Sequence, residues 1–410
     1  MNGDDQAPDE PRRPTAPGLL EVASSFLRLG CSSFGGPVAH LGYFRSEFVE
    51  RRRWLDDAHY SDLVALCQFL PGPASSQLVF ALGMQRAGLV GALVASACFT
   101  LPSAALMIAF ACGVAQAVDL TGAGWLHGLK LAAVAVVAQA VWGMGKKLCT
   151  DRARLSLCVG AAAALLLVPG AATQLGVIAC GGLVGWRLYK DTIAIGAAPG
   201  RTEGVRGHLA AAVALLLFLA LLFGLPAIVT ASGSRPLAVF DSFYRSGSLV
   251  FGGGHVVLPL LRAEIVPRGW LTNDQFLAGY AAAQALPGPM FTFAAYLGAA
   301  MGPGAPSVLN GLWSLLGIFL PAWLLIGGVL PFWRRLRAQR WAQAALAGAN
   351  ASVVGVLLAA LYDPVFTESV RGTQDVVAAL LAFGLLEHWK APPWWVVIVS
   401  AAAGQWLLGA

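Results

Sequence analysis

Two glycine-rich segments and two Pro-Gly-Pro segments contain the residues best suited to bind a ligand. Phe34-Gly-Gly-Pro-Val and Pro71-Gly-Pro in the first half have counterparts in Phe251-Gly-Gly-Gly-His and Pro287-Gly-Pro in the second half. Proline removes a backbone donor and clashes with the preceding turn, so these segments are expected to interrupt helices. Each interruption exposes the N–H groups and the positive dipole end of a half-helix, which favour a negatively charged ligand. The pattern predicts an anion site.

Short polar side chains and glycines beside the interruptions are the candidate substrate-binding residues. Hydroxyl, amide and main-chain donors could together replace the hydration shell of an oxyanion, and glycines let it approach the backbone. Any single serine is better explained as a helix cap or an interhelical hydrogen bond, so the prediction rests on the duplicated sets together. The candidates, with one lysine, are Ser32, Ser33, Gly35, Gly36, Gln68, Gly72, Ser75, Ser76, Lys130, Gly252, Gly253, Gln284, Gly288 and Thr292.

Three basic residues in or beside apolar stretches are candidates for attracting a dianion. Arg28 and Arg245 stand at equivalent places, one or two turns before the glycine-rich segments, and Lys130 corresponds to Asn350. A buried charge in a membrane segment is costly and commonly marks a substrate or ion pathway. The alternative is that these side chains extend to the lipid headgroups, which suits the two arginines better than Lys130.

Two histidines, His40 and His255, flank the glycine-rich segments at positions that are not equivalent. An imidazole titrates near neutral pH, so either could couple proton movement to transport, and a hydrogen-bonded structural histidine is the alternative. No metal or cofactor is expected, because none of the seven cysteines forms a CxxC pair. No P-loop, HExxH or GxSxG motif is present, which argues against an enzyme.

The elements that must position these residues are membrane-spanning helices. Of the 410 residues, 57% are hydrophobic and 12% charged, against about 25% charged in soluble domains. A soluble globular protein is therefore excluded, and an all-α polytopic membrane protein is predicted. The windows free of Asp, Glu, Lys and Arg reach the roughly 20 residues that cross a bilayer. They are 63–85, 87–118, 155–186, 207–234, 275–333, 341–362 and 391–410.

An internal duplication organises the chain. The segment from Phe26 to Gly36 matches the segment from Phe243 to Gly253, and Gln68 to Pro73 matches Gln284 to Pro289. So many ordered matches indicate two helical repeats. The predicted organisation is a disordered tail at 1–18, repeat 1 at 19–190, a linker at 191–235 with one extra span at 208–232, and repeat 2 at 236–410.

Loop charge predicts that the two repeats have inverted topology. Loop 146–154 contains four basic residues and its equivalent, 363–375, one; loop 115–124 contains no Lys or Arg and its equivalent, 334–340, four. Basic loops stay in the cytoplasm, so equivalent loops lie on opposite sides of the membrane. The net charge of +6 therefore reports orientation, not nucleic-acid binding.

The number of crossings depends on the first two apolar segments. If they are re-entrant, broken at the Gly-Gly-Pro and Pro-Gly-Pro motifs, Arg45 and Arg51 to Arg53 remain inside. Broken or re-entrant helices are the preferred interpretation, two ordinary kinked spans the alternative, and the count is about 9 to 13 crossings.

The motifs themselves resemble those of the chromate ion transporter family in its two-domain long form. The similar segments are FGGPVAHLGYFRSEFVERRRWL (34–55), CQFLPGPASSQL (67–78), FTLPSA (99–104), FGGGHVVLPLL (251–261) and ALPGPMFTFAAYLG (285–298). The resemblance implies chromate export across the cytoplasmic (inner) membrane, driven by the proton gradient and giving chromate resistance.

Composition and spacing alone lead only to an inverted-repeat secondary transporter for a small anion. Uptake or exchange of sulfate or another tetrahedral oxyanion stays an alternative, because size and charge are so alike. A membrane-embedded enzyme or scaffold is a lesser alternative. The expected partners are the oxyanion and membrane lipid, no nucleic acid is expected, and a homodimer is left open.

Overall fold

The computed structural model describes residues 18–34, 36–116, 124–191, 208–250, 257–301, 306–333 and 339–407. Within these ranges the regular elements are all helices, which confirms the all-α prediction. The predicted tail, apart from Gly18, and residues 192–207 of the predicted linker lie outside the described residues.

The first half of the chain, up to the extra helix, forms nine helical elements among the described residues. They are α1 (Leu19–Ser32), α2 (Gly36–Arg45), η1 (Ser46–Arg51), α3 (Asp57–Phe69), α4 (Ala74–Gln116), α5 (Gly124–Leu148), α6 (Arg152–Leu167), α7 (Ala171–Tyr189) and α8 (His208–Ser232).

The second half repeats much of this order. Its elements are α9 (Arg235–Ser248), α10 (Val257–Ile265), α11 (Asn273–Ala285), η3 (Met290–Thr292), α12 (Phe293–Ala300), α13 (Val308–Val329), η4 (Leu330–Phe332), α15 (Arg340–Ala360), η5 (Leu361–Phe366), α16 (Thr367–Ser369), α17 (Thr373–Glu387) and α18 (Pro393–Leu407).

The helices are interrupted where the motifs predict. In the first half α1 ends at Ser32 and α2 begins at Gly36, and Pro71-Gly-Pro separates α3 from α4. In the second half Pro287-Gly-Pro separates α11 from η3, and α9 ends just before the second glycine-rich segment. Proline and glycine stop these helices because they cannot maintain the regular donor ladder.

Five helices among the described residues are long and apolar enough to cross a bilayer. The charge-free window 275–333 is divided into several shorter helices, so charge-free length alone overstates straight spans. Helix α8 coincides with the predicted extra span, and only 11% of its most apolar window is buried, as expected for a lipid-facing helix. The five apolar stretches are Ala74–Gly113, Gly124–Leu148, His208–Ser232, Val308–Phe332 and Arg340–Ser369, the first of which is two helices that meet at Ala87 and Gly88, where the backbone is not helical.

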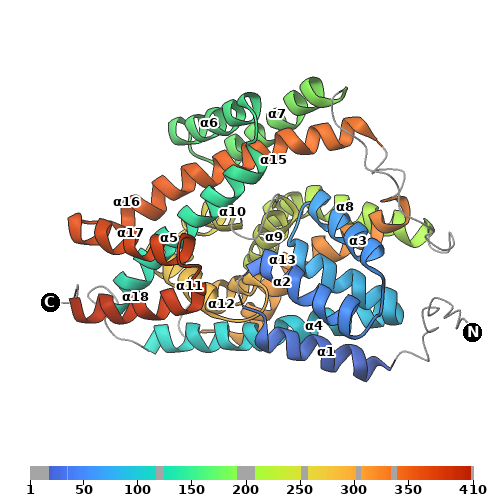
Figure 1. Ribbon diagram of the computed structural model, residues 1–410, viewed down its shortest axis with the longest axis horizontal. Coiled ribbons are helices and arrows are strands. Elements are labelled where there is room, and N and C mark those ends of the chain that lie inside the picture. The colour runs from blue at the N-terminus through green and yellow to red at the C-terminus, as the bar shows by residue number, and fades with distance from the viewer. Residues whose placement is uncertain are drawn as a thin grey trace, which may run out of the picture.

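The two halves of the chain exchange helices. Helices α6 and α7 of the first half pack along α15 of the second, while α17 and α18 of the second pack along α5 of the first (Figure 1). Gly128 of α5 lies against the backbone of Ser400, and Gly348 of α15 lies against the backbone of Gly181. Small residues permit these close approaches. The protein is therefore one interlocked helical body.

Candidate anion-binding site

Each Pro-Gly-Pro turn is hydrogen-bonded to the helix break of the other half. The Gly288 N–H donates to the Ser33 carbonyl oxygen at 2.8 Å, and the Gly72 N–H donates to the Val250 carbonyl oxygen at 2.7 Å. Ser33 and Val250 occupy equivalent positions immediately before the Phe-Gly-Gly motifs. The two bonds thus form a reciprocal pair that joins both breaks to both turns.

Both central glycines of these turns have backbone conformations that disfavour other residues. Gly72 has φ 123° and Gly288 has φ 90°. A Cβ atom at Gly288 would also lie 2.8 Å from the Ser103 hydroxyl oxygen, which is closer than such atoms approach. The sequence requires glycine here, because only glycine enters this conformation without strain.

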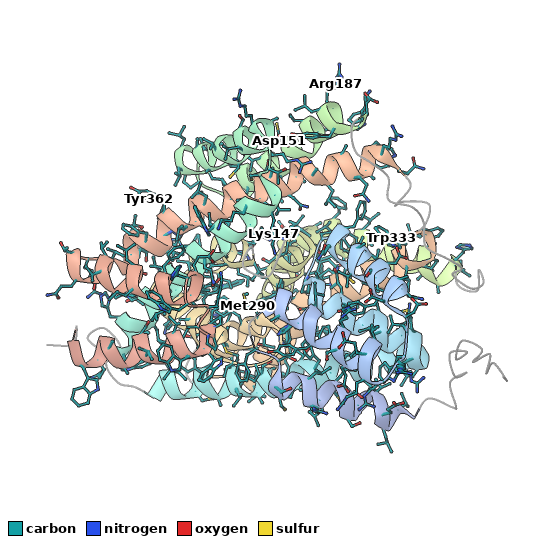
Figure 2. The ribbon with its side chains drawn as sticks, viewed as in Figure 1. Lys147, Asp151, Arg187, Met290, Trp333 and Tyr362 are labelled. Atoms are coloured by element: carbon teal, nitrogen blue, oxygen red, sulfur yellow. The ribbon has the colours of Figure 1, made fainter. Side chains whose placement is uncertain are left out.

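The preceding helices repeat the same close packing. Gly30 of α1 approaches the Phe99 carbonyl oxygen of α4, and Gly247 of α9 approaches the Ile318 carbonyl oxygen of α13. Met290, directly after the second Pro-Gly-Pro, is buried and lies near the middle of the molecule in the view of Figure 2. The breaks are therefore set in the packed centre of the protein, where irregular backbone is tolerated in a membrane protein.

Several buried polar atoms around the breaks have no hydrogen-bond partner among the described residues. They include the Ser33 and Ser76 hydroxyls and the Oε1 atom of Gln77, whose Nε2 donates to the Pro71 carbonyl oxygen at 2.7 Å. A buried polar group without a partner costs about 1–3 kcal/mol. Unpaired hydroxyls beside a helix break are the kind of donor that a bound oxyanion would satisfy.

His40 is hydrogen-bonded to the backbone of the first helix break. Its Nε2 lies 3.1 Å from the Ser33 carbonyl oxygen, the same oxygen that accepts the Gly288 N–H. Because a carbonyl oxygen only accepts, Nε2 carries a hydrogen. This contact supports the structural interpretation of the buried His40.

Other sequence candidates are held in local bonds or lie at the surface. The Ser32 hydroxyl donates to the Arg28 carbonyl oxygen, and the Thr292 hydroxyl donates to the Pro289 carbonyl oxygen. Ser75 is buried, Gln284 donates to the Met290 sulfur, and the equivalent Gln68 is exposed. Gly36 is described with φ 76° and open space at its Cβ position. Gly35, Gly252, Gly253 and His255 lie outside the described residues.

The predicted basic residues have very different environments. Lys130 is buried, and its Nζ lies 2.8 Å from Oδ1 of Asp274. Arg245 bonds Asp241 and Glu264, so its charge is balanced by two carboxylates, whereas the equivalent Arg28 is exposed. Equivalence in the sequence therefore did not place the two arginines in equivalent surroundings.

Sequence reasoning missed the acidic partners and one further pair. His127 Nε2 lies 2.7 Å from Oδ1 of Asp375, and both side chains are largely buried. His127 precedes Lys130 by almost one helical turn, which was the available signal. Glu264 and Asp274 lie near helix ends, where a charged side chain gives little signal, and Asp241 lies in the middle of α9, four residues before Arg245, which was a signal for that pair. No group of three or more potential metal ligands occurs among the residues that the structure describes.

Comparison with known proteins supports the motif assignment. A family model described as "Chromate transporter" matches residues 20–186 and 237–405. The chromate transport protein of Pseudomonas aeruginosa is 32% identical over 95% of this chain and 92% of its own length. The probable chromate transport protein of Synechococcus elongatus is 26% identical over 94% of this chain and 95% of its own length. The chromate transport protein of Cupriavidus metallidurans is 28% identical over 89% of this chain and 86% of its own length.

No solved structure matches. The two matched segments nevertheless cover most of both halves, together with the reciprocal helix breaks described above. This chain is a membrane protein of the chromate transporter family.

Proposed function

We propose that this protein is a secondary transporter that exports chromate across the cytoplasmic membrane in exchange for protons and so gives chromate resistance. The observation that carries the proposal is the reciprocal bonding of Gly288 to Ser33 and of Gly72 to Val250. It brings the breaks after α1 and α9 against the two Pro-Gly-Pro turns, directly after which α4 and η3 begin. The names of the relatives supply the chemical identity of the ion.

The proposed ion path uses main-chain dipoles and the hydroxyls of Ser33 and Ser76 at the helix breaks, and the charge of Lys130 near the start of α11. Positive helix ends and hydroxyl donors stabilise a tetrahedral oxyanion without needing a protein cation at every oxygen. Lys130 is buried, and its partner Asp274 lies about 13 residues, or about 20 Å of helix, before Pro287-Gly-Pro. Asp274 balances the charge of Lys130 in this structure, and chromate passing along the path would compete for it.

Inverted topology gives this site access from either side in turn. Opposite loop charges in equivalent positions support the inversion, and the exchange of α6 and α7 for α17 and α18 is the packing expected from pseudo-two-fold repeats. In this arrangement residues 146–154 and 334–340 are cytoplasmic, and the beginnings of α5 and α11 face the outside.

Flux in proteoliposomes tests the proposal. Chromate should move opposite to an imposed proton gradient and should reverse direction when the gradient is reversed. Excess sulfate tests the alternative substrate, since a sulfate transporter would lose chromate flux to competition. Absence of any anion flux from correctly inserted protein would exclude transport, and flux indifferent to the gradient would exclude proton coupling.

A further inference from the structure

Two equivalent helices, α3 and α11, have unequal neighbours. Helix α11 packs against α5 and α18, whereas among the described residues α3 makes no comparable contact with α15 or α7. In Figure 1, α11 lies beside α5 and α18, while α3 lies on the other side of the molecule. Within the described ranges, one of two pseudo-symmetric interfaces is therefore packed closed and the other is open.

Side-chain burial follows the same asymmetry. Leu277, Ala278 and Ala281 of α11 are fully buried. Their counterparts in α3, Ser61, Asp62 and Ala65, are exposed or half-buried. The difference covers about one turn along one helix face, since these positions follow the helical spacing.

The closed interface contains an ion pair that the open one lacks. Lys130 of α5 bonds Asp274 in the first turn of α11, with side-chain exposures of 3% and 42%. The equivalent positions are Asn350 in α15 and Ala58 in α3, which cannot form an ion pair. Asp274 is held at the helix start by the capping box of Thr272 and Gln275.

The location of the pair assigns it to one side of the membrane. Lys130 lies six residues after Gly124, or about 9 Å along α5 from its beginning. With the orientation proposed above, that beginning faces the outside. The structure is then closed to the outside and has its open interface toward the cytoplasm, where an exporter collects its substrate.

We propose that the Lys130–Asp274 ion pair is the latch of the outer gate, and that an oxyanion arriving from the cytoplasm opens it by taking Lys130 from Asp274. This inference rests on the proposed transport function.

The physical basis is competition for one buried ammonium group. A buried charge needs a counter-charge, and Asp274 is its partner in this structure. A dianion reaching Lys130 supplies that counter-charge and leaves Asp274, which is 42% exposed, free to return to water. The other acidic groups nearby are engaged, because Asp375 bonds His127 and Glu368 bonds Arg262 and Asn273. Gate opening is thereby coupled to occupancy.

Cysteine accessibility from outside intact cells tests the latch without requiring transport. The reporter is Ala281→Cys in a cysteine-free background, two turns below Asp274 on the same face and fully buried here. A membrane-impermeant maleimide should react slowly with this parent. Asp274→Asn should raise the rate about tenfold, since a gate state populated at a few per cent would become a major one.

Three matched variants make the result specific. Lys130→Gln removes the ion pair from the α5 side and should give the same increase in the labelling rate. It replaces Asp274→Asn if that variant fails to insert. The exchange Lys130→Asp with Asp274→Lys should restore slow labelling. Glu387→Gln removes an ion pair at the opposite end of α5 and should leave the rate unchanged. Equal labelling of the parent and both latch variants, or fast labelling of the exchange, overturns the proposal.

The competition step is tested in proteoliposomes. Chromate presented at the cytoplasmic face should increase labelling of the Ala281→Cys parent and should add nothing to Asp274→Asn. No effect of chromate on a parent that transports it would overturn the displacement of Asp274. A parent that shows the latch behaviour but no chromate flux would instead refute the proposed function.

Discussion

Helices α3 and α11 have similar local structure and different tertiary surroundings. Both begin with a side-chain cap, by Asp56 and by Thr272, both have 13 residues, and both end before a Pro-Gly-Pro turn. Yet α11 is enclosed by α5 and α18 while α3 is not similarly covered. The comparison teaches that duplicated sequence specifies duplicated elements, whereas the neighbours of each element depend on the packing of distant segments.

The largest expected effect comes from removing the charge that α11 contacts. Lys130→Ala should abolish chromate tolerance, because it deletes a buried cation of the proposed ion path and leaves Asp274 without its partner. Tolerance is measured as growth on chromate, with membrane abundance checked by immunoblot. Lys146→Ala, at the exposed end of the same helix, is the control and should retain tolerance. Wild-type tolerance in Lys130→Ala would remove Lys130 from the site.

The second prediction compares the two Pro-Gly-Pro turns. Gly288→Ala should reduce both flux and thermal stability, at a cost of about 1–3 kcal/mol, because of its positive φ and the nearby Ser103 hydroxyl. Gly72→Ala meets the end of the flexible Gln77 side chain and should cost less. Melting of the purified proteins in detergent measures the difference. Equal destabilisation of the two variants would show that backbone strain alone sets the loss of stability, and that the neighbouring side chains contribute nothing.

The third prediction tests the unequal burial of α3 and α11. Ala281→Trp should destabilise the protein by about 1–3 kcal/mol, since overpacking a filled interior forces neighbours apart. Ala65→Trp, at the equivalent half-buried position, should have a smaller effect on melting. Ala65→Trp should also slow chromate flux, because the indole would obstruct closure of the interface that α3 forms. A larger loss of stability in Ala65→Trp would contradict the assignment of open and closed sides.

The smallest effects concern the equivalent arginines that contact the starts of these helices. Arg45 bonds Asp57 and Glu50 at an exposed site, and Arg262 bonds Asn273 and Glu368 at a more enclosed one. Arg45→Ala should leave the melting temperature nearly unchanged, because water screens an exposed ion pair. Arg262→Ala should cost more, because it leaves the Glu368 carboxylate without this partner. Equal melting temperatures for the two variants would show that the enclosure is not energetically significant.

Much of the fold was predictable because it follows from local chemistry. Proline and glycine at the four motifs interrupt helices whatever surrounds them, and the residues around Ser33 and Gly288 could be proposed from that rule. The acidic partners could not, because Asp274 lies far from Lys130 in the chain and only packing of α11 on α5 joins them. The arginines divide in the same way: Asp241, four residues before Arg245 where Ser24 precedes Arg28, is a local signal, whereas the contact of Arg245 with Glu264 required the fold.

The amino-acid sequence by itself determined an all-helical membrane protein, the places where its helices stop, and its family, since apolar length, proline and glycine act locally. The tertiary structure alone decided which break meets which turn, which carboxylate holds Lys130, and which of two equivalent interfaces is closed. The physical reason is that these depend on contacts between segments that lie far apart in the chain.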